Sequence, residues 1–309
     1  MFKKFNWNGN VPQQYTADYG SQFILAKDKV EDFSRGNGNA FTMDSPGNEL
    51  ALQVQQDGYH VINWSADGGI TVKAGRLILD GSAVESDKDA ASLDVLIKDM
   101  TIGDDNGNFS AGVEIINAGH VRQESPSIIN IKKNGYFGIK NIYHGDSSTY
   151  RFSLTGNAVL EMSCPNALSV ASCDLSGASR AEIKCRSTPN ASGFTVQGSS
   201  RLWLYTEDVA KGTRFNLIDK GEVFLIRNPN PINFEDNNHI KINFDSASTG
   251  YIILDATFGI NKDKINTEDG MNFLLRNAMI SVDNFTQYDD RKVFFDLTPD
   301  YNFMVIGLR

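Results

Sequence analysis

FSLTGNAVLEM at residues 152–162 is followed by CDLSGASRAEI at 173–183, FTVQGSSRLWL at 194–204 and FNLIDKGEVFL at 215–225. The four segments start 21 residues apart, and each has apolar residues at its first, third, ninth and eleventh positions. A fixed period with a fixed apolar pattern is typical of a stacked repeat fold. The stretch from Phe152 to Ile226 therefore predicts that successive repeats lie on one another.

The repeat has the pattern of β-strands. Apolar and polar residues alternate in Leu202-Trp203-Leu204, which is a period of two, and the three-and-four spacing of an amphipathic helix is absent from this stretch. Glycine and short polar residues separate the apolar pairs, as expected for turns. One unit cannot bury its inner face alone, whereas stacked units with parallel strands about 4.8 Å apart can.

The pattern continues more loosely on both sides, from about Asn48 to Asp283, and gives roughly ten coils in total. Over this range the chain resembles the right-handed parallel β-helix proteins of the pectin-lyase-like group. The resemblance is one of repeat pattern, not of motif, so it implies fold and handedness but not activity. We expect an all-β protein whose β-helix occupies residues 48–283.

The two ends do not follow the repeat. Residues 1–47 are predicted to form an N-terminal cap segment of helix and loop, with the helix beginning near Ser21 and ending near Phe33. Residues 284–309 are predicted to form a C-terminal hairpin, with strands at 292–297 and 302–306 around a Thr-Pro-Asp-Tyr turn.

Charge and hydropathy limit the partners and the compartment. The chain has 309 residues and a net charge of −9, which argues against a nucleic-acid binder that follows the phosphate backbone. Lys3 and Lys4 are not followed by an apolar segment, so no signal peptide is expected. The longest apolar runs are too short to span a membrane. We therefore expect no membrane insertion and a protein that is cytoplasmic or exported by a route without the general signal.

The three cysteines, Cys164, Cys173 and Cys185, are predicted to be buried thiols of the core. They lack a fourth ligand at a zinc-binding spacing. Residues 104–108 begin the order of a calcium loop but do not complete it. The sequence predicts neither a metal site nor a cofactor.

A catalytic site is the alternative that the resemblance raises. Polygalacturonases of the group carry Asn-Thr-Asp, Asp-Asp, Gly-His-Gly and Arg-Ile-Lys on successive coils, with paired carboxylates acting across the glycosidic bond. Asp104 and Asp105 are followed one coil later by His120, but Val121 replaces the second glycine and the first and last elements are absent. We expect no release of sugars from pectin or polygalacturonate, and we retain a polysaccharide lyase or glycoside hydrolase acting on acidic polysaccharide as the alternative.

One outward-facing group of residues is apolar. If Leu202 and Leu204 face inward, Trp203 and Tyr205 face outward, and the next repeat puts Phe224 and Ile226 beside them. The flanking positions are expected to be polar: Glu182 and Lys184 on one side, Lys241 and Asn243 on the other. This island is covered by the C-terminal hairpin or a loop, contacts a partner or second subunit, or stacks on sugar rings.

The sequence thus favours a non-catalytic β-helix recognition or structural module, of the adhesin-like, virion or secretion-associated kind. Its partner would be a protein, a glycan or a second copy of the chain. The candidate binding residues are those of the apolar island, Trp203, Tyr205, Phe224 and Ile226.

Overall fold

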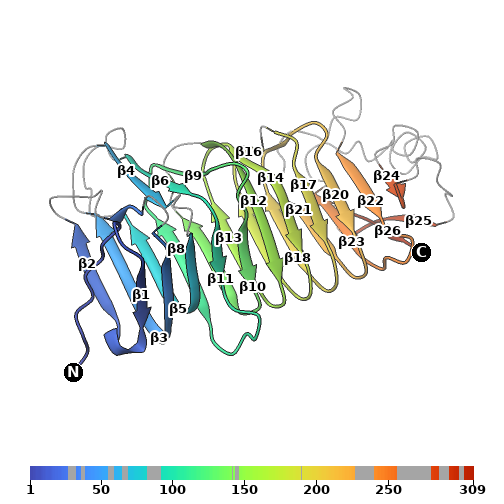
Figure 1. The fold of residues 1–309 in the computed structure, drawn as a ribbon. Coiled ribbons are helices and arrows are strands. Elements are labelled where there is room, and N and C mark those ends of the chain that lie inside the picture. The colour runs from blue at the N-terminus through green and yellow to red at the C-terminus, as the bar shows by residue number, and fades with distance from the viewer. Residues whose placement is uncertain are drawn as a thin grey trace. The chain divides into compact units, whose positions relative to one another are not determined.

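A computed structural model describes most of the chain. The described residues are 1–26, 33–35, 39–54, 59–64, 69–81, 92–140, 142, 146–188, 190–226, 240–255, 280–284, 292–298 and 303–309. They form two compact units, residues 1–166 and 167–309, which we describe separately. Apart from a single-turn 3-10 helix, Ala17–Tyr19, the regular elements of the described residues are β-strands (Figure 1). The prediction of an all-β chain is confirmed.

The first unit is built from parallel strands that pair in three rows. Its strands are β1 (Gln13–Thr16), β2 (Gln22–Ala26), β3 (Phe41–Val54), β4 (Tyr59–Trp64), β5 (Ile70–Asp80), β6 (Ser92–Ile97), β7 (Met100–Ile102), β8 (Ala111–Ile116), β9 (His120–Gln123), β10 (Ile129–Lys132), β11 (Gly135–Lys140), β12 (Asp146–Thr155) and β13 (Val159–Ser163). One row runs β1–β3–β5–β7–β10–β12, and a second runs β2–β3–β5–β8–β11–β13. The third row is β4–β6–β9. The long strands β3 and β5 contribute to both of the first two rows.

The second unit repeats this arrangement. Its strands are β14 (Leu168–Leu175), β15 (Arg180–Lys184), β16 (Ser187–Thr188), β17 (Gly193–Val196), β18 (Arg201–Tyr205), β19 (Asp208–Val209), β20 (Arg214–Leu217), β21 (Glu222–Ile226), β22 (Lys241–Phe244), β23 (Tyr251–Asp255), β24 (Ile280–Val282), β25 (Val293–Leu297) and β26 (Phe303–Leu308). The parallel rows are β14–β17–β20–β22–β24, β15–β18–β21–β23 and the short pair β16–β19.

The 21-residue repeat sets the register of the core in this unit. Leu204 is directly opposite Leu225, and Phe194 is opposite Phe215, so each pair is 21 residues apart as predicted. All four side chains are buried, and the two phenylalanine rings stack 5.3 Å apart. Each buried side chain of this size contributes about 1.5–3 kcal/mol to folding. The inward row therefore supplies much of the energy that holds adjacent strands together.

The prediction of which residues flank the apolar island was wrong on one side. Lys241 and Asn243 lie on β22, which pairs with β20, whereas the strand beside β21 is β23. Phe224 is thus opposite Ile253. The separation of paired residues grows from 21 to 29 here, and periodicity alone cannot then assign a strand to its row.

The predicted N-terminal helix is also wrong, because residues 22–26 form strand β2, which pairs in parallel with β3. Backbone pairing with a neighbouring strand overrides the weak helical spacing of this segment. Phe5 and Trp7 of the preceding segment are buried against Phe41, at ring distances of 6.3 and 4.8 Å. These aromatic side chains, and not a helix, cover the first core residues.

A buried arginine ties this segment together. Arg35 has no exposed surface, and its guanidinium lies 4.4 Å from the centre of the Trp7 ring. It donates hydrogen bonds to the carbonyl of Val11 at 3.1 Å and to the side chain of Gln13. Burial lowers the pKa of Arg35 to about 10, so it remains protonated at neutral pH. Charge-assisted bonds and the cation–π contact replace a carboxylate partner.

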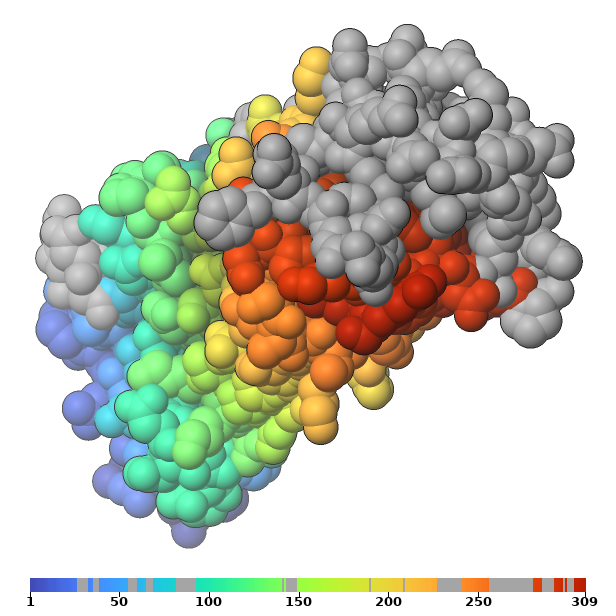
Figure 2. Space-filling view, turned by 90° about the vertical axis from the view of Figure 1, so that its right-hand side faces the viewer, coloured from blue at the N-terminus to red at the C-terminus, as the bar shows by residue number. Residues whose placement is uncertain are grey.

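The C-terminal hairpin is confirmed: β25 and β26 pair in antiparallel register, while the turn predicted at 298–301 lies mostly outside the described residues. β26 also pairs antiparallel with β23, with Met304 opposite Leu254. In the space-filling view, the red C-terminal residues lie against the orange residues near position 250 (Figure 2). The parallel order of the row therefore ends at β23. All three cysteines are buried, as predicted, and burial raises the pKa of the Cys173 thiol.

Candidate functional site

The predicted apolar island forms a stacked column on the outer side of β18 and β21. The rings of Trp203 and Phe224 are 5.1 Å apart and nearly parallel, at an interplanar angle of 5°. The Arg180 guanidinium lies 4.7 Å from the centre of the Trp203 ring, and Tyr251 meets Phe224 edge to face at 6.2 Å. Glu182 pairs with Arg180 at 2.9 Å, and its pKa is lowered, first by a hydrogen bond from Lys184.

This stacking limits what the island can bind. A sugar ring stacks on the face of an aromatic side chain, but Trp203 has Phe224 stacked against its ring, and the Arg180 guanidinium also lies over the ring. The arrangement suits stabilisation of the sheet better than a glycan platform. Tyr205 is similarly engaged, because the Lys184 ammonium lies 5.2 Å from its ring centre.

The apolar surface extends beyond the four predicted residues. Phe224 is opposite Ile253, and Ile253 is opposite Val305 of β26, so the outward row crosses four neighbouring strands. Trp203, Phe224, Ile253 and Val305 are each half-buried. We call this row the apolar face. β26 of the C-terminal hairpin pairs edge to edge with β23, and so the hairpin adds one strand to the apolar face.

The candidate catalytic residues are not brought together. Asp104 and Asp105 lie in the turn that precedes β8, and His120 begins β9 after it. β8 has six residues, which span about 20 Å at roughly 3.3 Å per residue. Asp105 pairs with Lys132 at 2.9 Å, and the Asp104 carboxylate accepts a hydrogen bond from the amide of Gly107. The Asp104 carboxylate therefore supports the local turn, and that of Asp105 is held by Lys132 of β10.

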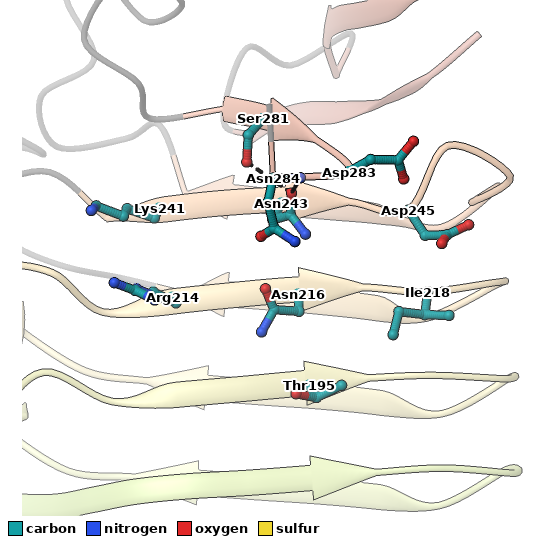
Figure 3. A pocket seen from close by; sticks show the side chains of 10 residues that line it. All are labelled: Thr195, Arg214, Asn216, Ile218, Lys241, Asn243, Asp245, Ser281, Asp283 and Asn284. Carbon is teal, nitrogen blue, oxygen red and sulfur yellow. Dashed lines mark hydrogen bonds between the residues drawn. The ribbon is translucent and has the colours of Figure 1, made fainter. Parts of the chain in front are cut away.

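A polar groove lies on the outer side of β17, β20, β22 and β24, with a volume of about 590 Å³ (Figure 3). This volume is within the range of about 300–1,000 Å³ usual for small-molecule sites. Thr195, Asn216, Asn243 and Ser281 occupy its middle, one on each strand, at directly opposed positions. At about 4.8 Å per strand, they form a row of amide and hydroxyl groups about 15 Å long.

The middle row still has hydrogen-bonding capacity. The Asn243 side-chain oxygen accepts hydrogen bonds from the Ser281 hydroxyl and the Asn284 amide, both at 2.8 Å. This fixes the amide orientation and leaves the nitrogen of Asn243 as a donor. Within the described residues, the side chains of Thr195 and Asn216 make no hydrogen bond. A bound ligand can therefore use donors and acceptors on three successive strands.

The two ends of the groove carry opposite charges. Arg214 and Lys241 lie opposite each other at one end, and Asp245 and Asp283 lie at the other (Figure 3). The Asp283 carboxylate accepts a hydrogen bond from the Ser246 amide at 2.8 Å, and that of Asp245 accepts one from the Ala247 amide at 3.0 Å. Both carboxylates thus hold turns.

A second polar group, in the first unit, has its charges satisfied internally. Glu114 is buried and pairs with Arg76 and, at 3.5 Å, with Lys140. Lys140 also lies 3.6 Å from Glu161, which accepts a hydrogen bond from the Tyr136 hydroxyl at 2.9 Å. Burial raises the pKa of Tyr136 to about 12. This network holds adjacent strands together.

Comparison with known proteins adds no relative: no family model, curated protein or solved structure matches the chain. Among the residues that the structure describes, no three His, Cys, Asp or Glu side chains are grouped so as to hold a metal ion. The same part of the chain has no helix with the length and apolar character needed to cross a bilayer.

Sequence reasoning missed the groove. Thr195 and Asn216 are 21 residues apart, so the repeat predicts that they lie opposite each other on the outer side. Beyond Asn216 the spacing between paired residues becomes longer than 21. Asn243 follows Asn216 by 27 residues and Ser281 follows Asn243 by 38, so spacing alone could not align them. The groove depends on strand pairing that the periodicity does not encode.

Proposed function

We propose that the parallel rows are the faces of a right-handed parallel β-helix. Strands of two main rows alternate along the chain, so that β17 pairs with β20 while β18 pairs with β21. Such alternation is expected when the chain winds repeatedly around one core. A crossover between parallel strands is right-handed in nearly all proteins, which supports the handedness.

We propose further that the protein is a non-catalytic recognition module that binds an extended, hydroxyl-rich ligand, a glycan, in the polar groove. The observation that carries this proposal is the row formed by Thr195, Asn216 and Asn243, whose side chains face the groove in register. Amides and hydroxyls repeated at strand spacing suit a ligand that presents hydroxyl groups along its length. The carboxylates of the groove hold turns, which favours binding over acid–base catalysis.

An array of neutral and acidic oligosaccharides tests this proposal. We expect the protein to bind at least one class and to release neither reducing ends nor unsaturated sugars. Asn216→Ala should weaken binding about fivefold, because a neutral hydrogen bond contributes about 0.5–1.5 kcal/mol. Calorimetric titration with the best oligosaccharide measures the change.

Asn130→Ala is the matched control, since Asn130 also lies half-buried and outward between two buried residues of a strand. It should leave binding unchanged. Absence of binding to every oligosaccharide would contradict the proposal. Turnover that disappears in Asp105→Asn would instead favour the enzyme alternative, acting on an acidic polysaccharide.

The apolar face favours a second function, self-association through a second copy of the chain. Its row of Trp203, Phe224, Ile253 and Val305 is half-buried and continuous across four strands, with the charged residues Arg201 and Glu222 beside it on β18 and β21. Homodimer contacts combine an apolar centre with a polar rim. This candidate requires that the exposed edges of the rings, and not their faces, make the contact.

Trp203→Ala combined with Phe224→Ala is expected to abolish concentration-dependent association measured by light scattering. The protein should remain folded, because the loss of one aromatic stack costs only about 0.5–1.5 kcal/mol beyond the lost area. Association that survives in the double variant while its melting temperature falls would assign the column to stability alone.

A further inference from the structure

We propose that Arg214 and Lys241 bind the carboxylate of an acidic sugar, so that the polar groove selects a hexuronate-containing glycan over a neutral one. This inference rests on the proposed function of the groove and specifies its ligand. The two cations lie beside the row of amides, on adjacent strands and in direct register, each on the same strand as one of the two asparagines.

The two cations differ from Arg186 and Arg201 of the same unit. Both are exposed, and neither makes an ion pair or a side-chain hydrogen bond within the described residues. Arg201, by contrast, pairs with Glu222 at 2.7 Å, and Arg186 pairs with Glu207 at 3.5 Å. Two like charges on adjacent strands repel each other unless an anion lies between them.

A carboxylate matches the groups present. The planar guanidinium of Arg214 can donate two parallel hydrogen bonds to it, and the ammonium of Lys241 adds a second positive charge. Cross-strand neighbours have Cβ atoms about 4.5–5.5 Å apart, which lets both cations reach one carboxylate. The chain as a whole carries a net charge of −9, so general attraction of polyanions does not explain such binding.

The cations lie close enough to the amides for one sugar to contact both. Arg214 precedes Asn216 by two residues, and Lys241 precedes Asn243 by two, so both pairs face the same side. Two residues of a strand span about 6.6 Å. A sugar with its carboxylate at the cations therefore presents its hydroxyl groups at the amides. Asp245 and Asp283 at the far end disfavour a second anion and give the site a direction.

The test compares a hexuronate oligomer with its methyl ester, which keeps the sugar rings but removes the negative charges, by calorimetric titration at low and moderate salt. We expect the acid to bind at least about tenfold more tightly than the ester, and this preference to fall as salt is added. Arg214→Gln combined with Lys241→Gln should remove the preference, so that acid and ester bind alike. Melting curves of the variant verify that it is folded.

Lys184→Gln combined with Arg186→Gln removes the same charge from the same unit, outside the groove, and should retain the preference. Equal binding of acid and ester by the unaltered protein would overturn this inference and leave glycan binding intact. Binding of neither would overturn the proposed function as well. A preference for a sulfated oligomer over the hexuronate would overturn the assignment to a carboxylate.

Discussion

Leu204→Asp is expected to unfold the protein or render it insoluble. Leu204 is completely buried, lies opposite Leu225 and belongs to the inward row that also contains Ile183 and Leu254. An aspartate at this position would be a buried charge without a partner, and such changes cost more than about 4 kcal/mol. Circular dichroism and urea denaturation of the purified variant measure the effect.

Tyr205→Asp is the matched control, because it introduces the same residue one position further along β18, on the outer side. There the carboxylate remains near water and beside Lys184. We expect it to remain soluble and cooperative. A soluble Leu204→Asp variant with an unchanged spectrum and midpoint would show that the register of the core is incorrect.

Arg35→Met is expected to destabilise the first unit by about 3 kcal/mol and to release the N-terminal segment. The substitution keeps an apolar stem but removes the guanidinium donors, so the part-buried hydrogen bonds to the Val11 carbonyl and the Gln13 side chain are lost. It also removes the cation from the Trp7 ring. The urea midpoint gives the loss of stability, and hydrogen exchange of residues 3–16 gives the release.

Lys3→Met tests whether any basic residue of this segment has such an effect. Lys3 pairs with Asp18 at 2.7 Å, but both side chains are largely exposed, and we expect no measurable shift in the midpoint. Protection of residues 3–16 that is unchanged in Arg35→Met would contradict the role assigned to Arg35.

The fold could be predicted where apolar and polar residues recur at a constant spacing. The alternation around Leu204 and Phe215 indicated both strand type and inward direction, and pairing 21 residues apart followed from it. Residues 22–26 were misassigned because their apolar spacing fits a helix locally, whereas the available edge of β3 is a long-range feature. Long-range pairing of this kind leaves little signal in a short window.

The candidate site, too, could be predicted from the sequence only in part. The outward direction of Trp203 and Phe224 was predictable, and their stacking follows from register. The Arg180 guanidinium lies over the Trp203 ring, which favours a structural role for the ring. This contact depends on a side-chain conformation that no sequence pattern encodes. The polar groove joins β20, β22 and β24, whose alignment crosses long intervening segments, so only the structure brings its residues together.

The reversed direction of β26 has a consequence for the time course of synthesis. β26 begins at Phe303, and its partner β23 ends at Asp255. A ribosome adding 5–20 residues per second needs roughly 2–10 s to make the ~50 residues between them. Throughout this interval the edge of β23 that β26 later covers is open to strands of other chains. Synthesis of β26 therefore ends a period of exposure, and slower translation of residues 256–302 should lower the yield of soluble protein.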